Sequence, residues 1–356
     1  MISFLTFLVI LLGVITFARI IRIFELSSVL RGTDVNAVNN SDNKTNSLLM
    51  LLFGSFFVIF VFYMTYAMKD KMLPVAASEH GAGIDSLFNW NMALLYVVFL
   101  ITHILLIYYA YRYYFKKEHK PIFFVHNNKL ELVWTIIPTI ILSSVIVLGI
   151  SKWSAITAPA AEDAIVIELY AKQFDWTARY AGDDNKLGKS TFRLADANNA
   201  VGVDYNDPDA GDDIIVRNEF HLPVGKEVVF KFNSKDVLHS AYMPHFRAQM
   251  NCVPGMTTQF HFKPTITTEG MRAETKNEKF DYILLCNKIC GASHFNMQMT
   301  IVVEDEASYK QWLGSKKTVA QELKAAETPA PAKTDSLAAP VDSAKVHATT
   351  AEVVKH

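Results

Sequence analysis

The sequence predicts an α-helical membrane anchor of about four transmembrane helices, followed by an all-β sandwich or barrel. Long apolar stretches recur up to Ile150, whereas short runs of alternating apolar and polar residues dominate from Ala164 onwards. Hydrophobic residues make up 51% of the 356 positions and charged residues only 19%, a composition that leans towards membrane proteins. The net charge of −1 shows no global basic field of the kind that binds nucleic acid, and three cysteines do not make a disulfide framework.

Four apolar stretches are each close to the ~20 helical residues that cross a bilayer. They lie within residues 1–30, within residues 47–68, and, as a hairpin within residues 90–152, at residues 92–114 and 132–150. The first stretch, residues 2–17 with an extension to Phe24, lacks the basic leader and the cleavage site of a signal peptide, so we expect it to remain as a helix. In the third stretch, His103 lies at membrane depth, where it is either functional or a neutral imidazole bonded to a neighbouring helix.

Basic residues set the expected orientation of these helices. Arg31 and Lys44 lie in the loop after the first stretch, and Lys116, Lys120 and Lys129 lie in the loop after the third. By the positive-inside rule both loops are cytoplasmic. Everything after the fourth stretch is therefore expected on the outer side of the membrane.

From Ala164 the chain reads as short β-strands separated by Gly, Pro and Asn turns. Such a series favours a sandwich or barrel of antiparallel strands. We expect the folded domain over residues 160–312, with a long insertion at residues 181–213. The tail, residues 313–356, is rich in Ala, Pro, Lys and Thr and has few large apolar residues, so it is predicted to be disordered.

The insertion carries eight aspartates against three basic residues. Such a segment has three interpretations. It is an acidic patch that attracts a basic partner, or it is a solvated loop, or it is a calcium site. The spacing of an EF-hand is not present, which makes calcium the weakest of the three interpretations.

The segment at residues 286–297 reads Cys-x3-Cys-x3-His-x2-Met. Thiolates and a thioether are soft ligands that favour copper, and imidazole suits it equally well. One thiolate with histidines and a weak methionine describes a mononuclear blue-copper site, whereas a second close thiolate lets two sulfurs bridge two copper ions. A disulfide between Cys286 and Cys290, or a zinc site completed by His294, remains an alternative, although Met297 is a poor zinc ligand.

A copper pair needs more ligands than this segment supplies. His239 lies in KDVLHSAYMP, after an apolar strand-like run at residues 228–232 and before Pro244. Both segments are therefore expected in loops at strand ends, where rigid β scaffolds place their sites. Cys252 lies away from these ligands and is interpreted as a small buried hydrophobe.

The His239 segment followed by CNKICGASHFNM resembles the binuclear CuA site of cytochrome c oxidase subunit II, a family within the haem-copper oxidases, and the resemblance covers roughly residues 85–312. It implies a cupredoxin-like Greek-key sandwich with two copper ions. It also implies that single electrons pass from a c-type cytochrome to haem in a catalytic subunit, which reduces oxygen and pumps protons. The implied ligands are the side chains of His239, Cys286, Cys290, His294 and Met297 and the backbone carbonyl of Lys288. Because the family usually has two helices, the first two apolar stretches are extra ones.

The resemblance further implies where electrons and protons enter. In the family an aromatic cluster at the position of KQFDWTARY accepts the electron, and its key residue is usually Trp. This chain has Phe174 there, with Trp176 two residues on. Since alternate residues of a strand share a face, we expect both on one face, with ordinary core packing as the alternative. ELVWTIIP resembles the family at Glu131, Trp134 and Pro138. Glu131 is then either near a proton pathway into the catalytic subunit or an acid favourably placed at a helix N-terminus.

Two further positions depart from the family. Many relatives hold a magnesium ion between this subunit and the catalytic one, using a carboxylate between the two cysteines and an aspartate before an Ala-x-Pro-Gly turn. Lys288 and Asn251 occupy those positions here. Because an ammonium group repels a cation, the site is expected to be absent or rebuilt. Lys288 is expected to pair with a carboxylate or haem propionate of the partner subunit instead.

The sequence contains no Cys-x2-Cys-His run for covalent haem, so copper without haem is expected in this chain. The expected location is a bacterial inner membrane, with the copper domain on the periplasmic side. A nitric oxide reductase subunit with the same copper domain remains an alternative. A membrane-bound copper-delivery protein also uses Cys-x3-Cys, but on a thioredoxin fold, and a quinol oxidase subunit would lack both cysteines.

Overall fold

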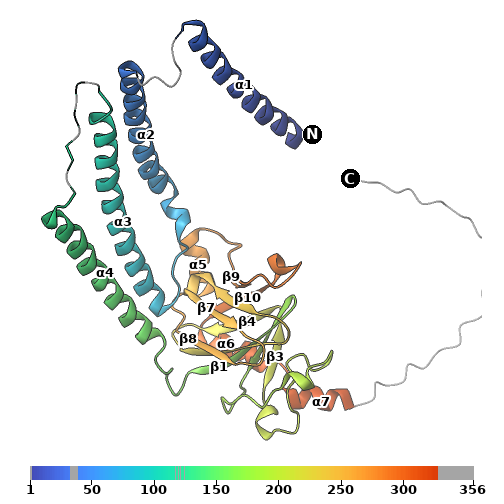
Figure 1. Cartoon of the computed structure of the whole chain (residues 1–356). Helices are drawn as coiled ribbons and strands as arrows, with labels where there is room; N and C mark the ends of the chain where they lie inside the picture. Colours follow the sequence, from blue (N-terminus) through green and yellow to red (C-terminus); the bar gives the residue numbers. More distant parts are fainter. Residues whose placement is uncertain are drawn as a thin grey trace, which may run out of the picture.

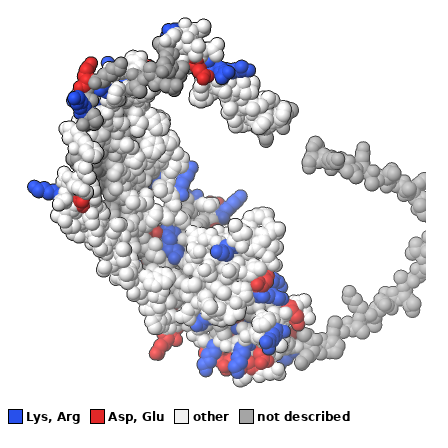
Figure 2. Space-filling view, in the orientation of Figure 1, with Lys and Arg blue, Asp and Glu red and all other residues white. Residues whose placement is uncertain are grey.

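The computed structural model describes residues 2–32, 39–116, 118, 120, 122–123 and 125–327. Four long helices precede a domain of ten strands, three short α-helices and four 3-10 helices (Figure 1). The long helices are α1 (Ile2–Leu30), α2 (Asn40–Met72), α3 (Glu79–Arg112) and α4 (Asn128–Ile156). All four are long and apolar enough to cross a membrane, which confirms the predicted anchor. Their sides are almost free of charge, whereas charged residues gather near the helix ends and on the sandwich domain (Figure 2).

Three of the long helices begin with polar caps that the apolar pattern alone does not reveal. The side chains of Asn39, Ser78 and Asn127 accept hydrogen bonds from the first turns of α2, α3 and α4. Such caps satisfy backbone N–H groups that have no partner within the helix. The helices therefore extend beyond the apolar stretches from which they were predicted.

Helices α2 and α3 pack against each other at several levels. Gly54 of α2 gives room to Ile107, because a Cβ at position 54 would lie 2.5 Å from the Ile107 side chain. The hydroxyls of Thr65 and Tyr96 are hydrogen-bonded at 2.7 Å. His103 donates from Nδ1 to the Phe99 carbonyl of its own helix at 2.8 Å, so among the described residues this nitrogen bonds within α3 and not, as expected, to a neighbouring helix. Its contact with α2 is instead a packing contact between rings, 5.8 Å from Phe57.

The strands form two five-stranded sheets, ordered β3-β2-β1-β5-β8 and β4-β10-β9-β6-β7. They are β1 (Ile165–Lys172), β2 (Asp175–Tyr180), β3 (Ile214–Arg217), β4 (Glu219–Pro223), β5 (Val228–Ser234), β6 (His239–Met243), β7 (Ala248–Cys252), β8 (Thr258–Phe262), β9 (Tyr282–Cys286) and β10 (Gln298–Glu304). One core with buried residues from both sheets makes this a sandwich, as expected, and not a barrel. The prediction of purely antiparallel strands is wrong, because β1 pairs with β5 and β4 with β10 in parallel. In each case the chain crosses to other strands before it returns in the same direction.

The connection between α2 and α3 fixes the sandwich to its anchor. Ala77 is fully buried in the sandwich core, and its backbone bonds to His245 and Thr265. At the start of α3, Asp85 accepts two hydrogen bonds from Arg247, at 2.7 and 2.8 Å. Ser78 donates to the Phe246 carbonyl at 2.7 Å. The sandwich therefore rests on the outer end of the helices as one packed unit.

The predicted disordered tail is wrong at its beginning. Helix α6 (Glu306–Gly314) stacks Trp312 on His221 with ring centres 3.8 Å apart, and helix α7 (Val319–Glu327) follows it. Val319 is buried, and its N–H donates to the Asp213 carbonyl at 2.8 Å. Packing against the sandwich and the insertion therefore orders the chain as far as α7. The rest of the predicted tail, residues 328–356, lies outside the described residues.

Carboxylates of the insertion bond to its own backbone. Asp196 accepts the N–H groups of Asn198 and Asn199, both at 2.7 Å. Asp212 accepts that of Asp183 at 2.8 Å in the same way. Short polar side chains often stabilise turns by such bonds. These aspartates therefore hold the insertion in shape, which favours the solvated-loop interpretation for them.

Candidate metal centre

Two strand ends of the second sheet bring the predicted ligands together. His239 is the first residue of β6 and Cys286 is the last residue of β9, and these strands are neighbours. The segment from Cys286 to Met297 closes on itself, because the Cys286 N–H donates to the Met297 carbonyl at 3.0 Å. The next N–H, from Asn287, donates to the Ser240 carbonyl at 2.9 Å. The strand ends therefore fix both the loop and the imidazole that faces it.

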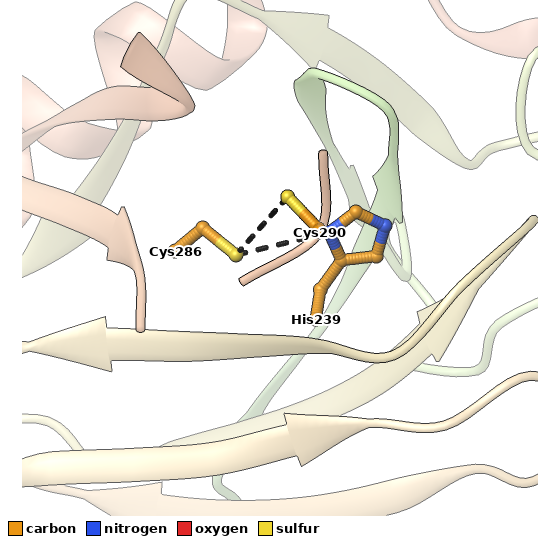
Figure 3. Close-up of side chains that lie close together, drawn as sticks. All are labelled: His239, Cys286 and Cys290. Carbon is orange, nitrogen blue, oxygen red and sulfur yellow. Dashed lines mark hydrogen bonds between the residues drawn. The ribbon is translucent and has the colours of Figure 1, made fainter. Parts of the chain in front are cut away.

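The two thiols occupy the middle of the cluster. Cys286 Sγ lies 3.7 Å from His239 Nδ1, 3.9 Å from Cys290 Sγ and 3.3 Å from the Lys288 carbonyl oxygen. Cys290 Sγ lies 3.5 Å from His294 Nδ1 and 3.9 Å from Met297 Sδ. Figure 3 shows the thiols of Cys286 and Cys290 close to each other and to the His239 ring. The structure thus brings together all six donor atoms that the sequence predicted.

The cluster suits a soft metal ion better than the alternatives. The cysteines are free thiols, so no disulfide is formed between them. Burial, reinforced by the neighbouring Cys286, raises the pKa of Cys290 to about 11. Two thiolates so close to each other require a cation between them. A thioether and two thiols favour copper, whereas a structural zinc site is usually closed by four Cys or His ligands.

Burial keeps most of these donors away from water. His239 is fully buried, Met297 is 1% exposed and Cys290 is 6% exposed. Asp236 accepts a hydrogen bond from His239 Nε2 at 2.8 Å, which leaves Nδ1 directed at the thiols. Burial alone would raise the pKa of Asp236, but hydrogen bonds from Gln173, His239 and Val237 outweigh it and hold this pKa below its ordinary value.

Sequence reasoning missed Asp236 and Gln173. Asp236 stands three residues before His239 in KDVLHS, and a carboxylate beside a metal-binding histidine is a common orienting partner. That spacing was an available signal. No local signal in the sequence pointed to Gln173, because this residue reaches the site from the other sheet.

The prediction that Phe174 and Trp176 share a strand face is wrong. Phe174 lies in the turn between β1 and β2, whereas Trp176 is fully buried in β2. Both nevertheless lie beside the cluster. Trp176 Nε1 donates to the Met297 carbonyl at 3.4 Å, and its ring centre is 6.3 Å from that of His239.

The remaining candidate residues supply no donor to the cluster. Cys252 is fully buried at the end of β7, opposite His239, and burial raises its pKa to about 12. It does not belong to the group of donors formed by His239, Cys286 and Cys290, as expected. Glu131 lies in the first turn of α4, where its carboxylate accepts the Asn127 N–H at 3.4 Å. That bond is the one expected of an acid at a helix N-terminus.

Known proteins resemble the chain over both the anchor and the sandwich. The family "Cytochrome C oxidase subunit II, transmembrane domain" matches residues 66–151, and "Cytochrome C oxidase subunit II, periplasmic domain" matches residues 165–305. The "Alternative cytochrome c oxidase subunit 2" of Bradyrhizobium diazoefficiens is 34% identical over 67% of this chain and 81% of its own length. The "Cytochrome c oxidase subunit 2" of Cereibacter sphaeroides is 27% identical over 67% of this chain and 77% of its own.

One similar solved structure is the periplasmic domain of subunit II of cytochrome oxidase (CoxB) of Bradyrhizobium japonicum. It is 21% identical, covers 47% of this chain and 99% of its own, and overlaps with a TM-score of 0.31. The transmembrane match begins near the end of α2. Helix α1 and most of α2 therefore lie outside the matched domains.

Proposed function

The chain belongs to the cytochrome c oxidase subunit II family, and we propose that it is the electron-accepting subunit of a cytochrome c oxidase with a binuclear CuA centre. The observation that carries this proposal is the arrangement of donors around the two thiols. Imidazole, thioether and carbonyl donors lie within 3.3–3.9 Å of Cys286 or Cys290 Sγ. A single-ion site does not need two central thiols with donors on both sides.

The proposed ligands divide by role. Cys286 and Cys290 would hold the copper pair from the middle of the cluster, because each contacts the other thiol and further donors. The remaining ligands would come from His239, His294, Met297 and the Lys288 carbonyl. When bound, the copper pair supplies one-electron transfer with the charge shared between both metals. The chain itself excludes water, orients the imidazole of His239 through Asp236, and fixes the loop through strand ends.

We propose that electrons reach the centre near Phe174 and Trp176. The Phe174 ring packs where a side chain at Gly291 would otherwise stand, next to Cys290. Trp176 bonds to the Met297 carbonyl and faces the ring of His239. These contacts support a short path from the turn between β1 and β2 to the ligands. The proposed donor is a c-type cytochrome, and the proposed acceptor is haem in the catalytic subunit.

The anchor supports the proposed location and partners. The four candidate membrane helices and the periplasmic-domain match describe a membrane-anchored protein with a periplasmic domain. We propose a bacterial inner membrane, with the exposed apolar sides of the helices packed against the catalytic haem-copper subunit, other oxidase subunits and lipid. Glu131 would lie at the cytoplasmic side of such an assembly, where we propose that it stands near the mouth of a proton pathway.

The magnesium site of the family does not fit this chain. Lys288 places an exposed ammonium group between the two cysteines, and Asn251 is an exposed amide on β7. Neither residue offers the carboxylate that Mg²⁺ prefers. We therefore propose that this interface site is absent or rebuilt, and that Lys288 bonds to an anionic group of the catalytic subunit.

The proposal is tested by loading the full chain, purified in detergent, with copper. We expect two copper ions per chain and a multi-line electron paramagnetic resonance spectrum, because one electron is shared by two nuclei. A four-line mononuclear spectrum, or a chain that binds only zinc, would overturn the binuclear assignment. Subunits that copurify from the native membrane decide between an oxidase and a nitric oxide reductase, which both accept such a domain.

A further inference from the structure

The turn between β1 and β2 belongs to the first sheet but contacts the loop of proposed ligands, residues 286–297, in the second. Gln173 and Phe174 form this turn, directly after the last residue of β1. The proposed side-chain ligands come from β6, β9 and the loop that follows β9. Contacts between the turn and that loop therefore cross from one sheet of the sandwich to the other.

Gln173 bonds to two ligand-bearing segments at once. Its backbone N–H donates to Asp236 Oδ2 at 2.7 Å, and the other oxygen of that carboxylate accepts from His239 Nε2 at 2.8 Å. Its side-chain Nε2 donates to the backbone carbonyl of Cys290. His239 and Cys290 are far apart in the sequence, and one residue thus connects both, through one bridging carboxylate and one direct bond.

The neighbours of Gln173 support the same loop by packing. A Cβ at Gly291 would lie 2.8 Å from Phe174 ring atoms and 3.0 Å from Gln173 Nε2. Gly291 also has a φ of +143°, which L side chains rarely adopt. The turn therefore leaves no room for a side chain at the loop residue after Cys290.

We propose that Gln173 is a positioning residue, which holds the His239 imidazole and the Cys290 backbone at a fixed separation before and after metal binding. The inference deepens the proposed copper function and rests on it for the loaded protein. Hydrogen bonds to groups around a metal site orient its ligands, and losing one typically lowers metal affinity by about 10–100-fold. Gln173 acts through Asp236 and the Cys290 carbonyl, so it needs no contact with the metal.

The test compares Gln173→Ala and Gln173→Glu in the full chain. Alanine removes the side-chain bond, and glutamate keeps the shape but places an acceptor against the Cys290 carbonyl. We expect both variants to lose copper to a chelator about 10-fold faster or more, with a changed hyperfine splitting. The matched control is Gln259→Ala, which removes an exposed amide whose oxygen accepts a hydrogen bond from Lys231 at 2.6 Å. It should leave both readouts unchanged.

A second readout uses the metal-free chain. If Gln173 holds the loop, alkylation of Cys286 and Cys290 by a maleimide should be several-fold faster in both variants than in the wild type. This arm stays informative even if the wild-type chain fails to form a copper pair. Rates within twofold of the wild type in both arms would overturn the proposal. A Glu variant that behaves like the wild type while the Ala variant does not would also overturn it, because space filling alone would then explain the residue.

Discussion

Two dense groups of side chains in the sandwich domain are built from different donors. The thiol cluster consists of the proposed ligands around Cys286 and Cys290, with separations of 3.3–3.9 Å. The guanidinium cluster consists of Arg179 between the carboxylates of Glu168 and Asp213, at 2.6 and 3.1 Å. All three of its side chains are at most 2% exposed. Arg179 also donates to the Gly188 carbonyl at 3.0 Å, which ties the insertion to β2.

The difference between the clusters shows which one needs an ion from outside. The guanidinium cluster contains hard oxygen donors together with their own cation. The thiol cluster contains soft donors, and among the described residues its thiols contact imidazole, thioether and carbonyl groups and each other. Soft donors without an internal cation are a metal site, whereas buried carboxylates with a guanidinium are a structural ion group. The first predictions below each break one cluster and should leave the other intact, and the last changes an exposed side chain that belongs to neither.

The largest effect is expected from Cys286→Ser or Cys290→Ser. A hydroxyl is a poor substitute for the soft thiolate, so either variant should lose the multi-line copper spectrum completely. Electron paramagnetic resonance and the copper content per chain measure this loss. Because the guanidinium cluster stays intact, we expect the thermal unfolding temperature of the metal-free variants to stay close to that of the metal-free wild type.

The matched control is Cys252→Ala. Cys252 is equally a cysteine in the second sheet, but it lies outside the donor group. We expect its copper spectrum to match the wild type, with some loss of stability from the small cavity. A lost copper pair in this variant would contradict the assignment of the ligands.

The second effect is expected from Arg179→Met, which leaves two buried carboxylates without their cation. Breaking a buried ion group by removing one partner typically costs about 3–5 kcal/mol. Urea unfolding followed by tryptophan fluorescence should show this loss, while the copper spectrum of the folded fraction stays unchanged. Arg217→Met removes an exposed arginine from β3 and serves as control. Equal losses in both variants would mean that Arg179 is not the centre of a structural group.

A smaller effect concerns pH. Burial raises the pKa of Asp213 from 3.8 to about 7, against the opposing influence of Arg179 and the Gly188 N–H. One guanidinium neutralises only one of two carboxylates, so a proton on Asp213 makes the group neutral. Because the folded state then binds this proton more tightly than the unfolded state, the contribution to stability is full below about pH 4 and declines as pH rises towards 7.

The Asp213→Asn variant isolates this contribution. The Asn carbonyl can keep the bonds that Oδ2 accepts from Arg179 and Gly188, and its NH2 group takes the place of Oδ1, which has no partner. We expect the wild type to lose more thermal stability than the variant between pH 5 and pH 8. Parallel pH profiles of the two chains would show that Asp213 does not titrate in this range.

The two clusters also differ in how far the sequence predicts them. Five of the six proposed donors stand within twelve residues, and the spacing and softness of the four side chains among them indicate copper without any structure. Arg179 and Asp213 are 34 residues apart and are ordinary surface residue types, so nothing in the pattern indicates that they pair in the interior. Asp213 was instead counted among the acids of an exposed insertion. Long-range pairing depends on strand order, which local patterns do not contain.

The turn at Gln173 shows a second limit of the sequence. KQFDWTARY alternates as a continuous strand would, so Phe174 and Trp176 were expected on one face. The chain instead reverses at Gln173 and Phe174, with no glycine or proline to mark the turn. The bonds that hold this turn come from Asp236 and Cys290, both distant in the sequence. Local propensity therefore could not reveal it.

The smallest effect is expected from Lys288→Ala, which contrasts an exposed cation with the buried Arg179. Only the backbone carbonyl of Lys288 faces Cys286 Sγ, and its side chain is exposed. Exposed charges contribute about 0–1 kcal/mol, so the copper spectrum and stability of the isolated chain should match the wild type. In the assembled oxidase the same substitution should weaken association with the catalytic subunit at low salt, if Lys288 bonds to an anionic group there. Measuring the salt dependence of that association for the wild type and for Lys288→Ala separates an effect in the assembled oxidase from one in the isolated chain. An effect already present in the isolated chain would mean that the side chain belongs to the copper site itself.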